Sequence, residues 1–192
     1  MVFRVRIQQV VSMIVALSVV GALVVSSAPV QADTAPPSSK TLETVSADPL
    51  PTVQVDGMVW DQVLVGNKVY AVGTFAEARP AGVALGGKGT VKRANILAFD
   101  IRTGVLDTVF VHSITAKNPS KKVVAAVTAS PDGTRLYVGG TFDAVDGQSR
   151  SNFAAFDLKT NKLLKGFDGT SNSVMALAAT NERVYVGGGF SK

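Results

Sequence analysis

LYVGGTF occupies residues 136–142, and VYVGGGF occupies residues 184–190. A third, more divergent copy, VYAVGTF, occupies residues 69–75. Between the last two copies, the tyrosine and the closing phenylalanine both recur after 48 positions, and between the first two copies both recur after 67 positions. A motif that returns in a fixed frame at a long period predicts a repeat architecture.

Around the second copy, the sequence predicts four short strands that are joined by turns. Runs rich in β-forming residues lie at 123–129, 136–142, 153–157 and 163–167. The segments between them carry typical turn residues, namely Ser130-Pro131-Asp132-Gly133, Asp146-Gly147 and Lys159-Thr160-Asn161. Four closely spaced strands of this kind predict one four-stranded antiparallel sheet.

The same pattern extends in both directions, so we predict units at about 56–120, 121–172 and 173–192. The first unit is 19 residues longer than the second by the spacing of its motifs. The extra residues fall within Ala76–Arg93 and near His112–Lys122, between predicted strands, as expected of loop insertions in a repeat scaffold. The further strands are predicted at 60–65, 69–75, 96–100 and 105–106 in the first unit and at 174–179 and 184–190 in the third.

A period near 50 residues with four strands per unit is typical of a β-propeller blade. Alanines at 125, 126, 176 and 178 give the first strands the thin side chains that suit the crowded centre of a propeller. We expect the glycine pairs at 139–140 and 187–188 to lie where neighbouring groups approach closely, and the tyrosines and phenylalanines to lie in the core. The predicted fold is therefore all-β, a β-propeller of four-stranded antiparallel blades with about two and a half blades present.

These residues also carry a family resemblance. The frame L/V-Y-V-G-G-T/G-F, followed by a D-G turn and then N-x-x-A-F-D-x-K/R-T, resembles the tandem repeats of secreted bacterial β-propellers. It is most similar to the delta-60 repeat of actinobacterial exported proteins. Kelch-like and YVTN-type propellers share the hairpin pattern, and SPDGTRLYV at 130–138 resembles the latter. The first unit departs from the frame at Ala71-Val72, and the resemblance implies no catalytic residues.

The number of predicted units bears on whether the chain is part of a longer protein and on its oligomeric state. Propellers close with about 4 to 8 blades, and an open array leaves unpaired sheet edges. We therefore expect this chain to be the N-terminal piece of a longer protein or the product of a truncated gene, and a full-length closed propeller to be a monomer. Closure by oligomerisation is the alternative.

The N-terminal quarter predicts export. Arg4 and Arg6 precede an apolar run at Val10–Val25, and Val30-Gln31-Ala32 offers the small residues of a cleavage site. This layout predicts a secretory signal peptide over residues 1–32, with an uncleaved anchor as the alternative because the run approaches the roughly 18 residues of a membrane span. Residues 33–55 are predicted to be a disordered linker because Asp33–Pro51 is rich in Pro, Ser and Thr. We expect a secreted, extracellular or cell-envelope protein with no membrane contact after cleavage.

The charge and the cysteine content exclude some classes of partner and of covalent link. The chain has 19 Lys and Arg against 14 Asp and Glu, and removal of Arg4 and Arg6 with the signal peptide lowers the net charge from +5 to +3. The basic residues are scattered without interleaved aromatic residues, so we predict no nucleic-acid partner. The chain has no cysteine, which excludes disulfides and a lipid anchor on cysteine.

Two segments suggest metal chemistry, and each has a simpler interpretation. His112 is the single histidine, so a multi-histidine metal site cannot be built within this chain, and we interpret His112 as a solvent-facing loop residue. The oxygen-rich loop Asp143–Ser149 suggests calcium, but it lacks the closing bidentate glutamate of an EF-hand loop. Asp146-Gly147 fits a hairpin turn better.

Two further patterns suggest catalysis or phosphate binding. Asp100 and Asp157 could be a glycosidase pair, but their equivalence by repeat predicts that each caps its own D-x-x-T turn. The glycine cluster at Gly86–Thr90 lacks the spacing of a phosphate-binding loop and is interpreted as a flexible insertion. We therefore predict no catalytic, cofactor-binding or metal-binding residue.

The sequence best fits a binding scaffold for a protein or glycan, and not an enzyme. The insertions at Ala76–Arg93 and His112–Lys122 are the predicted contact loops, because function in such scaffolds lies on loops. Finding both insertions on one face would support this interpretation. The alternative is a propeller-type extracellular lyase or glycoside hydrolase whose active-site residues lie in blades outside this chain, since Asp61 is the one charged residue on the predicted innermost strands.

Overall fold

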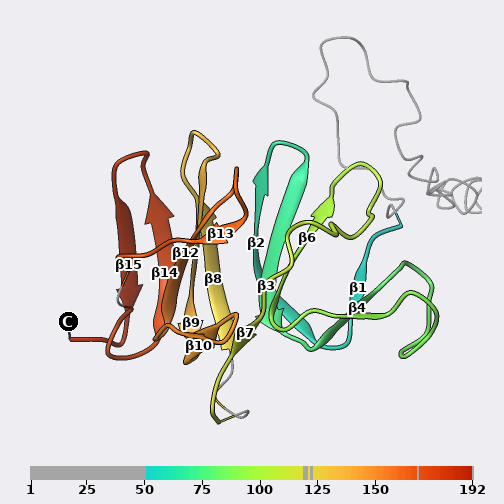
Figure 1. Cartoon of the computed structure of the whole chain (residues 1–192), viewed down its shortest axis with the longest axis horizontal. Coiled ribbons are helices and arrows are strands. Elements are labelled where there is room, and N and C mark those ends of the chain that lie inside the picture. Colours follow the sequence, from blue (N-terminus) through green and yellow to red (C-terminus); the bar gives the residue numbers. More distant parts are fainter. Residues whose placement is uncertain (1–50, 119–120, 122, 168, 192) are drawn as a thin grey trace, which may run out of the picture. The chain divides into compact units, whose positions relative to one another are not determined.

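The computed structural model describes residues 51–118, 121, 123–167 and 169–191. The predicted signal peptide and most of the predicted linker, residues 1–50, lie outside the described residues. Within them, the regular structure is β-strand without α-helix, and the strands form five antiparallel sheets in one compact unit. The all-β prediction is therefore confirmed, while the described sheets form no closed ring (Figure 1).

The second unit contains the predicted four-stranded sheet. Its strands are β8 (Val123–Ala129), β9 (Arg135–Thr141), β12 (Phe153–Asp157) and β13 (Lys162–Leu163), in the order β13-β12-β9-β8. The turns contain the residues that the sequence offered, with positive φ at Gly133 (69°) and Asn161 (53°). The fourth strand is shorter than predicted, because it begins one residue earlier and ends four residues earlier than the predicted 163–167.

The first and third units contain smaller versions of this sheet. The first has β2 (Met58–Val65), β3 (Lys68–Thr74) and β6 (Ile96–Asp100), and a single bridge from Phe99 to Leu106 replaces the predicted fourth strand. The third has β14 (Val174–Ala179) and β15 (Val184–Gly188). The first strands of the three sheets, β2, β8 and β14, lie next to one another (Figure 1).

Each first strand also carries a β-bulge at the same place. The pairing register shifts between Val59 and Asp61, between Val124 and Ala126, and between Val174 and Ala176. A bulge bends its strand and increases the local twist. The register shift therefore falls opposite the equivalent glycine, Gly73, Gly140 or Gly188, in all three sheets.

Two minor sheets repeat a second element of the unit. One consists of β1 (Gln54–Val55), β4 (Glu77–Arg79) and β5 (Val91–Lys92), and the other of β7 (Ile114–Thr115), β10 (Ala144–Val145) and β11 (Gln148–Ser149). In each, a hairpin that follows the second main strand pairs with a short strand that precedes the first main strand. The β10–β11 turn is Asp146-Gly147, with φ of 51° and 75°, as predicted for a tight hairpin.

Two short strands of the minor sheets lie outside the bounds that we predicted for the first and second units. β1 lies inside residues 33–55, which we assigned to the linker, because Val53 and Val55 pack against the buried cluster that includes Phe75 and Leu97. The composition of the preceding Pro- and Ser-rich stretch concealed these two apolar residues. β1 and β7 lie before residues 56 and 121, the positions at which we predicted the first and second units to begin.

The core lies between the main sheets. Tyr70, Ile96, Leu136 and Phe156 belong to the buried cluster between the first and second sheets, and Tyr137 belongs to the one between the second and third. Tyr70 and Tyr137 are 4% and 2% exposed, as predicted for core aromatics, but Tyr185 is 56% exposed. The core prediction is therefore wrong for Tyr185.

The four glycines of the predicted pairs, at 139–140 and 187–188, differ in how closely their neighbours approach. A Cβ atom on Gly139 would overlap the Val174 side chain of the next sheet, and one on Gly140 or Gly188 would overlap backbone of the neighbouring strand. Gly187 has only the Cβ and carbonyl oxygen of Ala176 nearby, at 3.7 and 3.8 Å, which is ordinary contact. The predicted close approach is confirmed at 139, 140 and 188 and is wrong at 187.

Candidate binding pocket between the inserted loops

A pocket of about 460 Å³ lies between the two minor sheets. Both predicted insertions contribute to it, residues 76–93 through β4 and β5 and residues 112–122 through the segment that enters β7. The two insertions therefore meet on one side of the molecule, as a shared binding role requires. The lining residues are Ala76, Glu77, Lys92, Ala94, Val111, His112, Ser113 and Asp146.

The first insertion presents an acid and a base at the pocket. Glu77 and Lys92 are opposite each other in the β4–β5 pair. The start of β4 is held by Asp56, whose Oδ1 accepts the backbone N–H groups of Ala76 at 2.8 Å and Glu77 at 2.9 Å. Burial raises the pKa of Asp56, but these N–H donors outweigh burial and hold its pKa below the ordinary value.

The second insertion places His112 against Asp146, and the prediction that His112 faces solvent is wrong. Its side chain is 8% exposed, and its Nδ1 lies 2.6 Å from Oδ2 of Asp146. Oδ1 of Asp146 accepts the N–H of Ser113 at 2.8 Å. Burial raises the pKa of Asp146, and the contacts to His112 and Ser113 lower it further than burial raises it.

The His112 ring is enclosed by aromatic side chains. Its centroid lies 4.6 Å from that of Phe110 and 4.5 Å from that of Phe156. Nε2 is buried and contacts no hydrogen-bond partner among the described residues. Because Nε2 is buried, it cannot reach a ligand in the pocket, and the contact with Asp146 holds the β10–β11 hairpin against the segment before β7.

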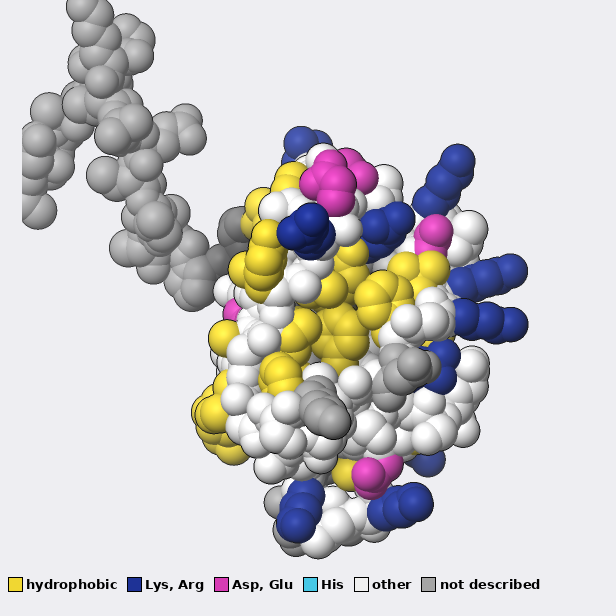
Figure 2. All heavy atoms as spheres, turned by 90° about the vertical axis from the view of Figure 1, so that its left-hand side faces the viewer, with side chains coloured by type: hydrophobic (Ala, Val, Ile, Leu, Met, Phe, Trp, Pro, Cys, Tyr) yellow, Lys and Arg dark blue, Asp and Glu magenta, His cyan; other side chains and the backbone are white. Residues whose placement is uncertain are grey.

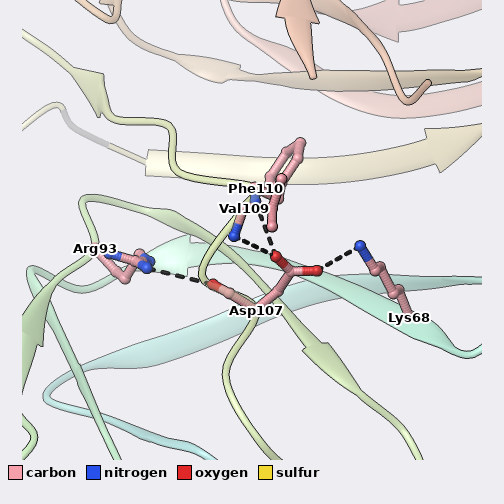
Figure 3. A network of polar contacts seen from close by, with 5 residues as sticks. All are labelled: Lys68, Arg93, Asp107, Val109 and Phe110. Atoms are coloured by element: carbon pink, nitrogen blue, oxygen red, sulfur yellow. Dashed lines mark hydrogen bonds and ion pairs between the residues drawn. The ribbon is translucent and has the colours of Figure 1, made fainter. Parts of the chain in front are cut away.

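A charged network around Asp107, earlier in the same segment, was not predicted (Figure 3). Oδ1 of Asp107 accepts the N–H groups of Val109 at 2.6 Å and Phe110 at 2.9 Å, and Oδ2 lies 2.5 Å from Nζ of Lys68. Arg93 donates to the carbonyl of Asp107 at 3.3 Å. These contacts hold in place the segment that carries Phe110 and His112. In the sequence, the network could have been recognised from Asp107, which lies two and three residues before the N–H groups that its carboxylate accepts.

The candidate carboxylates are engaged in turns. Oδ1 of Asp100 accepts the N–H of Thr103, and Oδ1 of Asp157 accepts the N–H of Thr160, so the predicted D-x-x-T caps are confirmed. Asp143 accepts the N–H of Lys117 at 2.7 Å. In the part of the chain that the structure describes, no group of three or more metal-ligating side chains could hold a metal ion.

Two other predicted features have structural positions. Oδ2 of Asp61 accepts the N–H of Val127 at 2.8 Å and so links β2 to β8. The glycine cluster lies within residues 80–90, the connection between β4 and β5, where Gly86 and Gly89 have φ of 70° and 89°. That connection is the inserted loop that the sequence predicted.

The chain matches no family model, and no curated protein or solved structure shows significant similarity to it. Among the described residues, no helix is long and apolar enough to cross a membrane.

Proposed function

We propose that this chain belongs to a secreted or cell-envelope β-propeller of the delta-60 repeat type that binds a protein or glycan partner. The recurring strand order, bulge and minor sheet support the blade interpretation, because one supersecondary unit recurs with its loops varied. The signal-peptide pattern of residues 1–32 supports export. The proposal includes no catalytic activity, cofactor or nucleic-acid partner.

The observation that carries the binding role is the meeting of two insertions in one pocket. Insertions into a repeat unit are tolerated anywhere on its loops, so their convergence favours a shared role. The pocket combines apolar walls, such as Ala76 and Val111, with the charged groups of Glu77 and Lys92. A concave, mostly apolar surface with a few polar groups suits a small part of a larger ligand.

A binding screen tests this role. The full chain would be screened against a glycan array and an array of extended peptides, and each hit would be measured again with Glu77→Lys and Lys92→Glu. We expect at least one of these variants to change the affinity for a true ligand by tenfold or more, about 1.4 kcal/mol. Lys162→Glu, on the exposed strand β13, is the matched control. Ligands that bind all four proteins equally would refute the pocket assignment.

Export has its own test. The full-length gene expressed in a secreting bacterial host is expected to give protein in the medium or envelope that begins at Asp33, as read by mass spectrometry of the N-terminus. Retention of Met1 on membrane-bound protein would instead favour the anchor alternative.

A further inference from the structure

A second concave site lies in the first unit, at the end of the molecule away from β15 (Figure 1). It is a pocket of about 440 Å³, within the range of about 300–1,000 Å³ that is typical of small-molecule sites. Its apolar lining consists of Pro51, Pro80, Ala81, Val91, Val105 and Leu106. None of these residues lines the pocket that contains Glu77 and Lys92, so the two pockets are separate sites.

The insertion in the first unit builds one wall of this pocket. β4 and β5 are joined by residues 80–90, whereas β10 and β11, their equivalents in the second unit, are joined by Asp146-Gly147 alone. The longer connection folds into successive turns, in which the N–H groups of Val83, Gly87 and Thr90 each donate to the carbonyl three residues earlier. The second unit, with its short turn, lacks this wall.

Hydrogen bonds join the three segments that form the pocket. The N–H of Val53 donates to the Gly104 carbonyl at 2.9 Å, which ties the chain before β1 to the turn after β6. Arg79 donates through Nε to the Val83 carbonyl at 2.8 Å and through Nη1 to the Val55 carbonyl at 3.0 Å. These bonds tie β4 to its own connection and to β1. The pocket is therefore preformed, and a ligand binds without the cost of ordering a loop.

The charge on the lining of this pocket has one sign. Arg79 is the one charged residue that lines it among the described residues. A guanidinium has five N–H groups, and those of Arg79 beyond the two bonds above have no hydrogen-bond partner in the described part of the chain. Asp56 is near enough to interact with the charge of Arg79 but does not line the pocket. An apolar wall with a single cationic donor favours a ligand that joins an apolar body to an anionic head.

We propose that this pocket binds a small amphipathic carboxylate, with its apolar body against Val91, Val105 and Leu106 and its carboxylate on Arg79. Burial of the apolar body supplies affinity. Charge-assisted hydrogen bonds to the guanidinium supply the selectivity for an acid. The site is independent of the protein or glycan partner proposed above.

Three probes of equal chain length test the ligand class. Octanoate, octanol and octylamine are titrated separately into the full chain by isothermal titration calorimetry. Octanoate is expected to bind saturably and by roughly tenfold or more tighter than octylamine, because Arg79 attracts the acid and repels the amine. No binding of octanoate, or an affinity no higher than that of octylamine, would overturn the proposal.

A pair of matched variants locates the site, because an anionic probe can also be attracted by other basic side chains. Figure 2 shows Lys and Arg side chains around the face at the β15 end of the molecule. Val105→Glu places an acid on the pocket wall, and Val109→Glu places the same charge in the same segment but off the lining. The two valines are 64% and 67% exposed, so both variants should fold. We expect Val105→Glu to weaken octanoate binding by roughly tenfold or more and Val109→Glu to change it by less than about twofold. Equal effects of the two variants would refute the site.

Arg79→Gln tests the contact with the carboxylate. We expect it to weaken octanoate binding by roughly five- to tenfold and to leave octanol binding unchanged. Arg102→Gln, in the exposed turn after β6 and off the lining, is the matched control. The proposal is overturned if Arg79→Gln weakens both probes equally, since Arg79 would then act only by holding the wall in place. It is also overturned if the chain forms a dimer that Val105→Glu dissociates, since the pocket would then be an interface between copies of this chain.

Discussion

Asn152 repeats in the second unit the contacts that Asn95 makes in the first. Both residues have left-handed φ, at 64° and 65°. Oδ1 of each accepts the N–H of the phenylalanine that closes the preceding motif, at 3.1 Å for Phe75 and 3.2 Å for Phe142. Nδ2 of each donates to a carbonyl in the segment that leads to the next sheet, at 2.6 Å for Ile114 and 3.0 Å for Thr170. These two amides therefore join successive units.

Asn95→Ala is expected to lower the free energy of unfolding by about 2–4 kcal/mol. The substitution removes the hydrogen bonds of the Asn95 amide to the Phe75 N–H and the Ile114 carbonyl, and the two bonds together contribute about 1–3 kcal/mol, at roughly 0.5–1.5 kcal/mol each. Alanine at positive φ adds roughly 1 kcal/mol. Urea denaturation of the variant and the wild type, at constant m value, measures the loss.

Asn95→Gly is the control for the backbone term, because glycine accepts positive φ without strain. Asn95→Gly should therefore lower the free energy of unfolding by about 1–3 kcal/mol, which is the contribution of the amide side chain. A glycine variant as stable as the wild type would show that the amide does not join the units.

Gly139 and Gly187 are equivalent by repeat but should respond differently to alanine. At Gly139 a Cβ overlaps Val174 of the next sheet, so Gly139→Ala is expected to cost about 1–3 kcal/mol through overpacking. At Gly187 a Cβ would make only ordinary contact with Ala176, so Gly187→Ala should be neutral or should stabilise the chain by up to about 1 kcal/mol. Thermal denaturation of both variants, followed by circular dichroism, checks the difference.

The reverse order of these two effects would mean that the third sheet does not pack on the second as observed. Gly188→Ala provides an internal check, since its Cβ would meet the Ser173 carbonyl and should be costly in either case.

The strands were predictable because their signals are local. Turn residues with required backbone geometry, such as Gly133 and Asn161, bound each apolar run, and repetition of the frame fixed the alignment of the units. The minor sheets were not predictable in the same way. Their strands have two or three residues, too short for a period to show, and β1 pairs with a segment more than twenty residues away.

The pocket was predictable in part. The insertions were visible as extra length between equivalent residues, and loops of this kind were expected to carry function. The contact between His112 and Asp146 spans 34 positions and depends on how the hairpin folds back, which no local pattern encodes. Exposure of Tyr185 was likewise hidden, because the motif around it matches that of the buried Tyr137.

The ion pair between Lys68 and Asp107 predicts that the free energy of unfolding falls both at acidic and at strongly alkaline pH. Burial raises the pKa of Asp107, but the contact to Lys68 and the N–H groups of Phe110 and Val109 hold it below the ordinary value. The stabilisation by Asp107 is therefore complete above about pH 4, the unfolded pKa, and is lost as pH falls through the lower folded pKa. The pKa of Lys68 is raised, chiefly by the hydrogen bond to Asp107, so its contribution is complete below about pH 10.4 and is lost as pH rises through the folded pKa.

Lys68→Met tests this pair. At pH 7 we expect a loss of about 0.5–1.5 kcal/mol, because the lysine is partly exposed and the bond is screened. The loss should shrink between pH 4 and pH 2 as Asp107 becomes protonated, and urea midpoints measured over that range give the slope. Lys162→Met in the exposed strand β13 is the matched control. A loss that is unchanged at pH 2 would assign the effect to packing of the lysine stem.

His112→Phe separates the packing of the His112 ring from its contact with Asp146. Phenylalanine keeps an aromatic ring between Phe110 and Phe156 but removes the Nδ1 donor, so the Asp146 carboxylate retains the Ser113 N–H alone. We expect a stability loss of about 1–2 kcal/mol at pH 7. We also expect a rise in the pKa of Asp146, because burial would no longer be opposed by the histidine.

A ¹³C NMR titration of the Asp146 carboxyl in both proteins measures the change in its pKa. Asp132, whose carboxylate accepts a hydrogen bond from Ser130, is the internal reference. If the pKa of Asp146 stays where the wild type has it, the Ser113 N–H alone sets its charge, and His112 acts only through its aromatic contacts.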